Sequence, residues 1–294
     1  MSVEHYENFP VASWLCPPAL RPPIVAIYRF ARTADDIADE GDASAEVRVA
    51  DLAAFRADLQ AAAAGGEPSR WPEVFGPLAR AIAQHRLPVR LLADLLDAFT
   101  DDALQTRYVD RAGLLDYCRR SANPIGRLLL HLHRIDDAPS LTRSDAICSA
   151  LQLANFWQDL GVDAARGRVY VPAADARRHG VAIDELLALR DGAHVHALVA
   201  DLTAWARELM LSGAPLVRSL AGRAGWELRF VVQGGLAILD KIDRLGGATL
   251  LRRPTIGWRD APLLAWRAGT MRGRSAPTPA PAHRASGDAS GGAP

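Results

Sequence analysis

The chain has 294 residues and a mass of 31.7 kDa, with 49% hydrophobic and 23% charged residues. This is the composition of a globular protein, and the length is sufficient to bury a sizeable core. Its 34 basic residues are balanced by 34 acidic ones, whereas nucleic-acid-binding proteins usually carry a basic excess. We therefore expect no nucleic-acid partner.

The cysteines and the N-terminus indicate the compartment. Three cysteines lie far apart, in no paired or metal-binding spacing: Cys16, Cys118 and Cys148. Such an arrangement is typical of reduced thiols in the cytoplasm. Residues 1–10 include Glu4 and Glu7 where a signal peptide needs an apolar core, and no apolar run approaches about 18 residues. We expect a cytoplasmic protein, and peripheral contact with the inner face of the membrane stays open.

The pattern of apolar residues predicts helices and no sheet. Alanine and leucine dominate over valine and isoleucine, and no alternating apolar series is long enough for a sheet. From Ser275 onward the chain has no large apolar residue, so it cannot offset its ordering entropy. We predict an all-α single domain over residues 1–272 and a disordered tail over 273–294. The expected helices cover 24–40, 47–64, 73–86, 89–105, 111–134, 144–166, 183–191, 193–211, 213–222 and 224–245.

Acidic residues form a stripe on the first predicted helix. At about 100° per residue, Tyr28, Arg32, Asp35 and Asp39 fall within roughly 60° of one another. The stripe adjoins the apolar face of the helix and therefore borders the core. A solvated acidic face is the simplest interpretation of one such pattern.

A second polar stripe follows on the predicted helix 144–166. Gln152, Asn155, Asp159 and Asp163 fall within about 80° of one another. These side chains are costly to bury without partners, so something polar or cationic should face them.

Together the two stripes suggest more than neutralised surface charge. Each aspartate pair is spaced i,i+4, where like charges destabilise a helix. Mg²⁺ typically takes one or two carboxylates plus phosphate oxygens, so two such helices facing each other would hold a diphosphate and make it a better leaving group. Arg166 and Arg168, beside the second stripe, would bind the departing phosphate in fork geometry.

A third segment carries a proline inside a predicted helix. Pro124 interrupts 111–134 and is flanked by Ala122, Asn123 and Gly126. Proline removes a helical hydrogen bond and kinks the helix. The small neighbours either leave room for a ligand or allow a bend that serves packing alone, and both alternatives stay open.

With these motifs the sequence resembles the squalene/phytoene synthase family of class I head-to-head isoprenoid synthases, from about His5 to Arg253. The resemblance implies an α-helical isoprenoid synthase bundle around an apolar pocket, with aspartates binding Mg²⁺ at its mouth. The matching motifs, in order, are Arg32-Asp35-Asp39, Tyr117-Cys118, Gln152-Asn155-Asp159-Asp163 and Arg168-Tyr170.

The resemblance also implies roles for individual residues. The implied catalytic residues are Arg32, Tyr117, Gln152, Asn155, Arg168 and Tyr170. The implied substrate-binding residues are His5, Tyr28, Arg32, Ala122, Asn123, Gly126, Gln158, Arg166 and Arg168. The implied ligands of Mg²⁺, or of Mn²⁺ in its place, are Asp35, Asp39, Asn155, Asp159 and Asp163.

Within the family, details resemble the hopanoid-pathway branch. Coupling members commonly show N-x-x-R-D-x-x-E-D, whereas this chain has Gln158 and Val162 at the Arg and Glu positions, and Asn123-Pro124 replaces a small pair. The implied substrate is a C30 prenyl diphosphate, and the implied reaction is conversion of presqualene diphosphate and water to hydroxysqualene and diphosphate. Ionisation, carbocation rearrangement and a water quench need no NADPH, and hand-over to neighbouring pathway enzymes stays open.

Two alternatives remain from the sequence. One is a head-to-head prenyl transferase that makes presqualene diphosphate or phytoene. The other is a non-catalytic assembly relative, although such relatives tend to lose the paired aspartates that this chain retains. The absence of a GxGxxG dinucleotide motif says little about NADPH, because squalene synthases also lack it.

Overall fold

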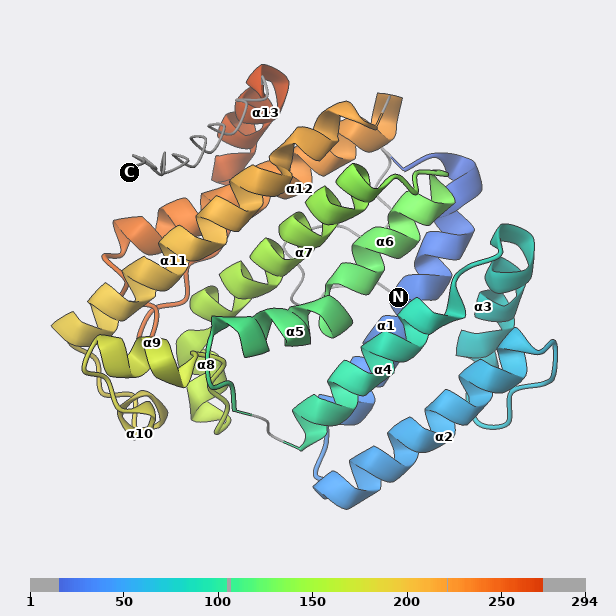
Figure 1. Ribbon diagram of the computed structural model, residues 1–294, viewed down its shortest axis with the longest axis horizontal. Coiled ribbons are helices and arrows are strands. Elements are labelled where there is room, and N and C mark those ends of the chain that lie inside the picture. Colours follow the sequence, from blue (N-terminus) through green and yellow to red (C-terminus); the bar gives the residue numbers. More distant parts are fainter. Residues whose placement is uncertain (1–15, 105–106, 221, 272–294) are drawn as a thin grey trace, which may run out of the picture.

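The computed structural model describes residues 16–104, 107–220 and 222–271 (Figure 1). These residues form helices and contain no β-strand, which confirms the all-α prediction. The helices are α1 (Arg21–Asp39), α2 (Ala45–Ala63), α3 (Pro72–His85), α4 (Val89–Ala103), α5 (Arg111–Ser121), α6 (Asn123–Leu132), α7 (Ala138–Gln158), α8 (Leu160–Ala165), α9 (Ala173–Arg178), α10 (Ile183–Leu187), α11 (Ala193–Gly213), α12 (Gly222–Arg244) and α13 (Ala261–Thr270), with 3₁₀ turns at Pro18–Leu20, Ala214–Arg218 and Trp258–Asp260.

Local sequence explains several helix ends. Pro22 lies in the first turn of α1, where a missing N–H costs nothing, and the chain leaves this helix through Gly41 at a φ of 79°. The Ser44 hydroxyl accepts from the Val47 amide and caps the start of α2. Asp137 caps α7 by accepting from the Ser140 amide at 2.9 Å.

Some predicted boundaries were wrong. The expected helix 111–134 is two helices, α5 and α6, because Pro124 in the first turn of α6 has no N–H to continue the ladder. The expected helix 144–166 starts earlier, at the Asp137 cap, and is divided into α7 and α8 at Asp159. Within the segment expected as helix 213–222, Ala214–Arg218 form a 3₁₀ turn, and α9 and α13 were not expected. The predicted disordered tail lies outside the described residues.

The first four helices bury an aromatic cluster. Phe30, Phe55 and Phe75 are fully buried, and the Phe55 ring centroid lies 5.3 Å from that of Phe30 and 4.6 Å from that of Phe75. Each ring removed from water contributes about 1.5–3 kcal/mol. This core holds α1 firmly against α2, α3 and α4.

Helix α7 lies through the middle of the molecule, between α11 and α12 on one side and α5 and α6 on the other (Figure 1). Its C-terminal end, the end of α1 and the last turn of α4 are brought together around residues 168–170. No described helix combines the length and apolar character needed to cross a bilayer.

Candidate active site

The first aspartate pair lies on the last turns of α1. The Arg32 guanidinium contacts Asp35 at 3.2 Å, Asp36 at 2.8 Å and Glu40 at 2.9 Å. Tyr28 lies one turn earlier on the same helix. Arg32 therefore balances the acidic residues of its own helix.

An arginine joins the two motifs. Arg168, in the segment after α8, places Nη1 2.6 Å from Asp39 Oδ2, although the two residues are 129 positions apart in sequence. Arg166 lies close enough to Asp163 for its positive charge to oppose, in part, the burial that raises the pKa of that carboxyl. The two polar stripes therefore border one site.

The second aspartate pair lies at the α7–α8 junction. The Asp163 amide donates to the Asp159 carbonyl at 2.9 Å, so the two residues stay one turn apart despite the helix break. Arg253 approaches Asp159 from a distant segment, with Nε 2.5 Å from Oδ1 and Nη2 3.2 Å from Oδ2. Gln152 and Asn155 lie on the preceding turns of α7.

Burial and a neighbouring carboxylate raise the pKa of one aspartate in each pair. Burial, followed by the charge of Asp39, raises the pKa of Asp35 to about 7. Burial and the charge of Asp159 likewise raise the pKa of Asp163 to about 7. The site therefore holds more negative charge than its arginines neutralise, and a further cation would stabilise the ionised forms.

The donor set fits magnesium that is shared with a substrate. Among the described residues, no three His, Cys, Asp or Glu side chains converge into a metal cage. Mg²⁺ does not require one, because it is commonly held by one or two carboxylates, waters and substrate phosphates. Asp35 with Asp39, and Asp159 with Asp163, supply pairs of this kind.

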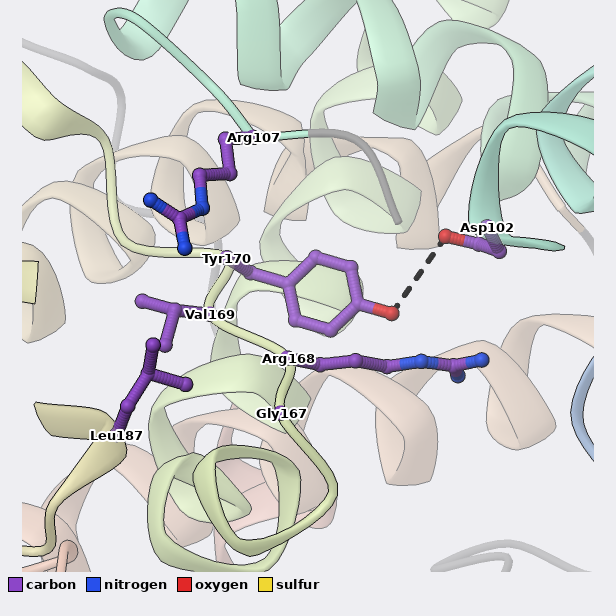
Figure 2. A pocket seen from close by; sticks show the side chains of 7 residues that line it. All are labelled: Asp102, Arg107, Gly167, Arg168, Val169, Tyr170 and Leu187. Carbon is purple, nitrogen blue, oxygen red and sulfur yellow. Dashed lines mark hydrogen bonds between the residues drawn. The ribbon is translucent and has the colours of Figure 1, made fainter. Parts of the chain in front are cut away.

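Aromatic side chains and a further carboxylate border the same site. The Tyr117 hydroxyl donates to Asp102 Oδ2 at 2.6 Å. The Tyr170 hydroxyl donates to Asp102 Oδ1 at 3.5 Å (Figure 2). The Tyr170 ring stacks on Phe156, with centroids 3.8 Å apart and planes 9° apart. Tyr108 packs beside Tyr117 and Tyr170.

A polar cavity opens next to this cluster. Figure 2 shows Arg168 and Tyr170 extending from one loop, with Asp102 on the far side of the Tyr170 hydroxyl. The cavity is lined by Asp102, Arg107, Gly167, Arg168, Val169, Tyr170 and Leu187.

Sequence reasoning missed several of these residues. Asp102 carried a usable signal, because it lies on the same face of α4 as Leu95 and Ala98, both buried. A carboxylate on a buried stripe is costly and therefore conspicuous. Arg253 carried no such signal, since only the tertiary fold brings it to Asp159.

Two of the predicted substrate contacts, Asn123 and Gly126, make packing contacts in the structure. The Ser149 hydroxyl donates to Asn123 Oδ1 at 2.9 Å in the buried α6–α7 interface. A Cβ at Gly126 would collide with Ser144 Oγ and Cys148 Sγ, so this glycine allows α6 to approach α7 closely. The structure thus favours the packing alternative for these two positions, and Ala122 marks the break between α5 and α6.

Gln158, another predicted substrate contact, is bonded to the backbone of the protein itself. Its side chain is 1% exposed, and Nε2 donates to the Pro254 carbonyl at 2.7 Å. The amide therefore holds the chain segment around Pro254 in place. The sequence prediction had assigned this side chain to substrate binding. His5, the remaining predicted substrate contact, lies outside the described residues.

Comparisons with known proteins agree with this site. The squalene/phytoene synthase family model matches residues 3–260. This chain belongs to the squalene/phytoene synthase family. A hydroxysqualene synthase of Sinorhizobium fredii (strain NBRC 101917 / NGR234) is 36% identical over 237 residues, which cover 80% of this chain and 78% of the relative. A phytoene synthase of Cereibacter sphaeroides is 31% identical over 260 residues, which cover 84% and 71% respectively.

A solved structure supports the same assignment. The crystal structure of the squalene synthase HpnC from Alicyclobacillus acidocaldarius has a TM-score of 0.75 and 37% identity, and the match covers 82% of this chain and 90% of that chain. The squalene/phytoene synthase resemblance predicted from the motifs is thereby confirmed. The chain is an isoprenoid synthase of this family.

Proposed function

We propose that this chain converts presqualene diphosphate and water to hydroxysqualene and diphosphate, as a carbon–oxygen lyase. The observation that carries the proposal is the Arg168–Asp39 contact at 2.6 Å, because it unites both aspartate motifs around one site suited to a diphosphate. The similarity to a hydroxysqualene synthase over 80% of the chain supports this branch of the family.

In this proposal the polar residues serve the ionisation step. The carboxylates of Asp35, Asp39, Asp159 and Asp163 would hold Mg²⁺, which when bound supplies positive charge that makes diphosphate a better leaving group. The planar guanidinium of Arg168 binds diphosphate oxygens in fork geometry as the carbon–oxygen bond breaks.

The aromatic residues serve the cation that remains. The stacked Phe156 and Tyr170 rings, with Tyr117 beside them, present apolar surfaces and π faces. Ring faces stabilise a nearby cation electrostatically. Apolar walls also limit the number of waters that reach the cation before it has rearranged.

The position of Gln158 favours a single diphosphate. Coupling members commonly place arginine there, but this chain has a buried amide bonded to Pro254. An amide carries no charge, and this one is engaged with the protein backbone. A head-to-head transferase remains the alternative, since the phytoene synthase of Cereibacter sphaeroides is also similar over most of the chain.

Product analysis distinguishes the candidates. Purified protein with Mg²⁺ and presqualene diphosphate is expected to yield hydroxysqualene without NADPH, and Mn²⁺ is expected to substitute for Mg²⁺. Farnesyl diphosphate alone should give no C30 product. Efficient formation of presqualene diphosphate, squalene or phytoene from shorter diphosphates would establish the transferase, and no turnover of either substrate would favour an assembly relative.

A further inference from the structure

Asp102 is a carboxylate in the site that none of the aspartate motifs accounts for. It lies on the last turn of α4, lines the cavity, and meets the Tyr170 hydroxyl from the segment after α8 (Figure 2). It also meets the Tyr117 hydroxyl from α5. Two other parts of the chain thus converge on this side chain.

The two oxygens of Asp102 are used unequally. Oδ2 accepts a short hydrogen bond of 2.6 Å from Tyr117. Oδ1 is 3.5 Å from the Tyr170 hydroxyl, at the outer limit of a hydrogen bond. Because a carboxylate oxygen accepts more than one hydrogen bond, Oδ1 retains capacity for a water molecule.

The two tyrosines that contact Asp102 are less suited to accept a proton. Burial and the charge of Asp102 raise the pKa of Tyr117 and of Tyr170 well above their usual range, so both remain phenols. Burial raises the pKa of Asp102 to about 6, which leaves it ionised at neutral pH yet able to hold a proton. Asp39 and Asp159 are each paired with an arginine.

Asp102 also lies next to the surface assigned to the cation. Tyr170 stacks on Phe156 through its ring and reaches Asp102 through its hydroxyl. A water bound at Oδ1 would therefore lie at the edge of the aromatic cluster.

We propose that Asp102 is the general base of the water quench, an inference that rests on the proposed function. Diphosphate has already left with the electron pair of its carbon–oxygen bond. A lone pair of the water oxygen forms the new carbon–oxygen bond, an O–H bond breaks with its electrons remaining on oxygen, and the proton passes to Asp102 Oδ1. The products are a neutral alcohol and protonated Asp102, which then loses its proton to solvent.

The test separates diphosphate release from the fate of the cation. Asp102→Asn keeps the shape but removes the base, so hydroxysqualene formed per diphosphate released should fall about tenfold or more. C30 hydrocarbons, formed when the cation loses a proton, should replace it. Diphosphate release and Mn²⁺ affinity measured by EPR should stay within about threefold of wild type.

The adjacent residue provides a matched control. Asp101 pairs with Arg120 at 2.6 Å, so Asp101→Asn should leave the product ratio unchanged. Asp102→Ala with added formate is the second variant, since a small carboxylate should restore the alcohol. An unchanged product ratio in Asp102→Asn, or no restoration by formate, overturns the proposal.

Other outcomes are equally decisive. If Asp102→Asn lowers Mn²⁺ affinity or diphosphate release as much as it lowers alcohol formation, Asp102 is a ligand of the metal or diphosphate and the base assignment is wrong. If the wild-type protein makes no hydroxysqualene, the proposed function fails irrespective of any Asp102 variant.

Discussion

The two aspartate pairs reach the site by different routes. Asp35 and Asp39 lie on the uninterrupted helix α1, whose adjoining apolar face is buried through Phe30 and Ala34. Asp159 lies at a break between helices, where residues 250–254, called here the docked segment, contact the α7–α8 junction. The first pair is placed by local sequence and the second by tertiary contacts.

Three contacts hold the docked segment. Gln158 donates to the Pro254 carbonyl across 96 positions of sequence, and Arg253 pairs with Asp159. The Leu250 carbonyl lies so close to Gly161 that a Cβ there would collide with it. Substitutions in this segment should therefore disturb the second aspartate pair and leave the first intact.

The largest expected effect is loss of an aspartate itself. Asp35→Asn and Asp159→Asn should each lower turnover on the order of a thousandfold, because preorganised charge at the diphosphate is removed. Circular dichroism and thermal melting should show a folded protein. Asp42→Asn, at an exposed position just beyond α1, is the control. Near-normal turnover of either variant at limiting Mg²⁺ would show that the carboxylate does not serve a metal.

Gly161→Ala tests whether the docked segment positions the second aspartate pair, and it leaves the first pair unchanged. The added Cβ should push the Leu250 carbonyl away and destabilise the protein by about 1–3 kcal/mol, as overpacking does. Turnover should fall more steeply at low Mg²⁺, since Asp159 loses its neighbours. Denaturant unfolding and a Mg²⁺ titration measure both effects.

A second helical glycine serves as the control. Gly76 lies in α3 with no atom within 4 Å of an added Cβ, so Gly76→Ala should stabilise the protein by up to about 1 kcal/mol. If Gly161→Ala is equally harmless, the docked segment does not press on α8.

Much of the fold was predictable because its causes are local. The end of α1 at Gly41 and the cap at Ser44 depend on residues within a few positions of one another. The Asp137 cap is equally local, although the predicted helix began at 144 and missed it. The aspartate stripes were predictable for the same reason, since helical periodicity alone places side chains one turn apart.

The rest of the site depends on residues that are distant in sequence. Nothing near Gln158 indicates that its amide meets Pro254, and the sequence favoured a contact with substrate. The small residues around Pro124 were ambiguous for the same reason, because a ligand and a neighbouring helix both require space. Only the position of α7 decides that Asn123 and Gly126 face a helix.

Gln158→Leu should have a smaller effect than Gly161→Ala. It removes the donor to the Pro254 carbonyl without adding bulk, and a lost buried hydrogen bond costs about 1–2 kcal/mol. Gln60→Leu, on the exposed side of α2, should change stability by less than about 0.5 kcal/mol. Unchanged stability together with a higher KM for presqualene diphosphate would instead support a direct substrate contact.

The smallest expected effect is a pH-dependent change in stability caused by Asp35, in the first aspartate pair. The pKa of Asp35 is about 7 in the folded protein against about 4 when unfolded. The folded state therefore holds a proton that the unfolded state releases, and metal-free stability should fall as the pH rises from about 4 through 7. The side chain that Asp35→Asn introduces does not titrate. The free energy of unfolding of this variant should therefore exceed that of wild type only slightly at pH 4 and most at pH 8. The Asp35 side chain is 41% exposed, and solvent screening limits the gain to the order of 1 kcal/mol.

Asp58 gives a control in which stability changes with pH in the opposite direction. Burial alone would raise its pKa, but hydrogen bonds from the amides of Ser69, Arg70 and Trp71 lower it overall. Its stabilising effect is therefore present above pH 4 and lost on acidification, so Asp58→Asn should destabilise the protein most at neutral pH.

Mg²⁺ with diphosphate should abolish the advantage of Asp35→Asn and leave the effect of Asp58→Asn unchanged. An advantage of Asp35→Asn that does not vary with pH would show that helix propensity, rather than crowded negative charge, distinguishes the variant.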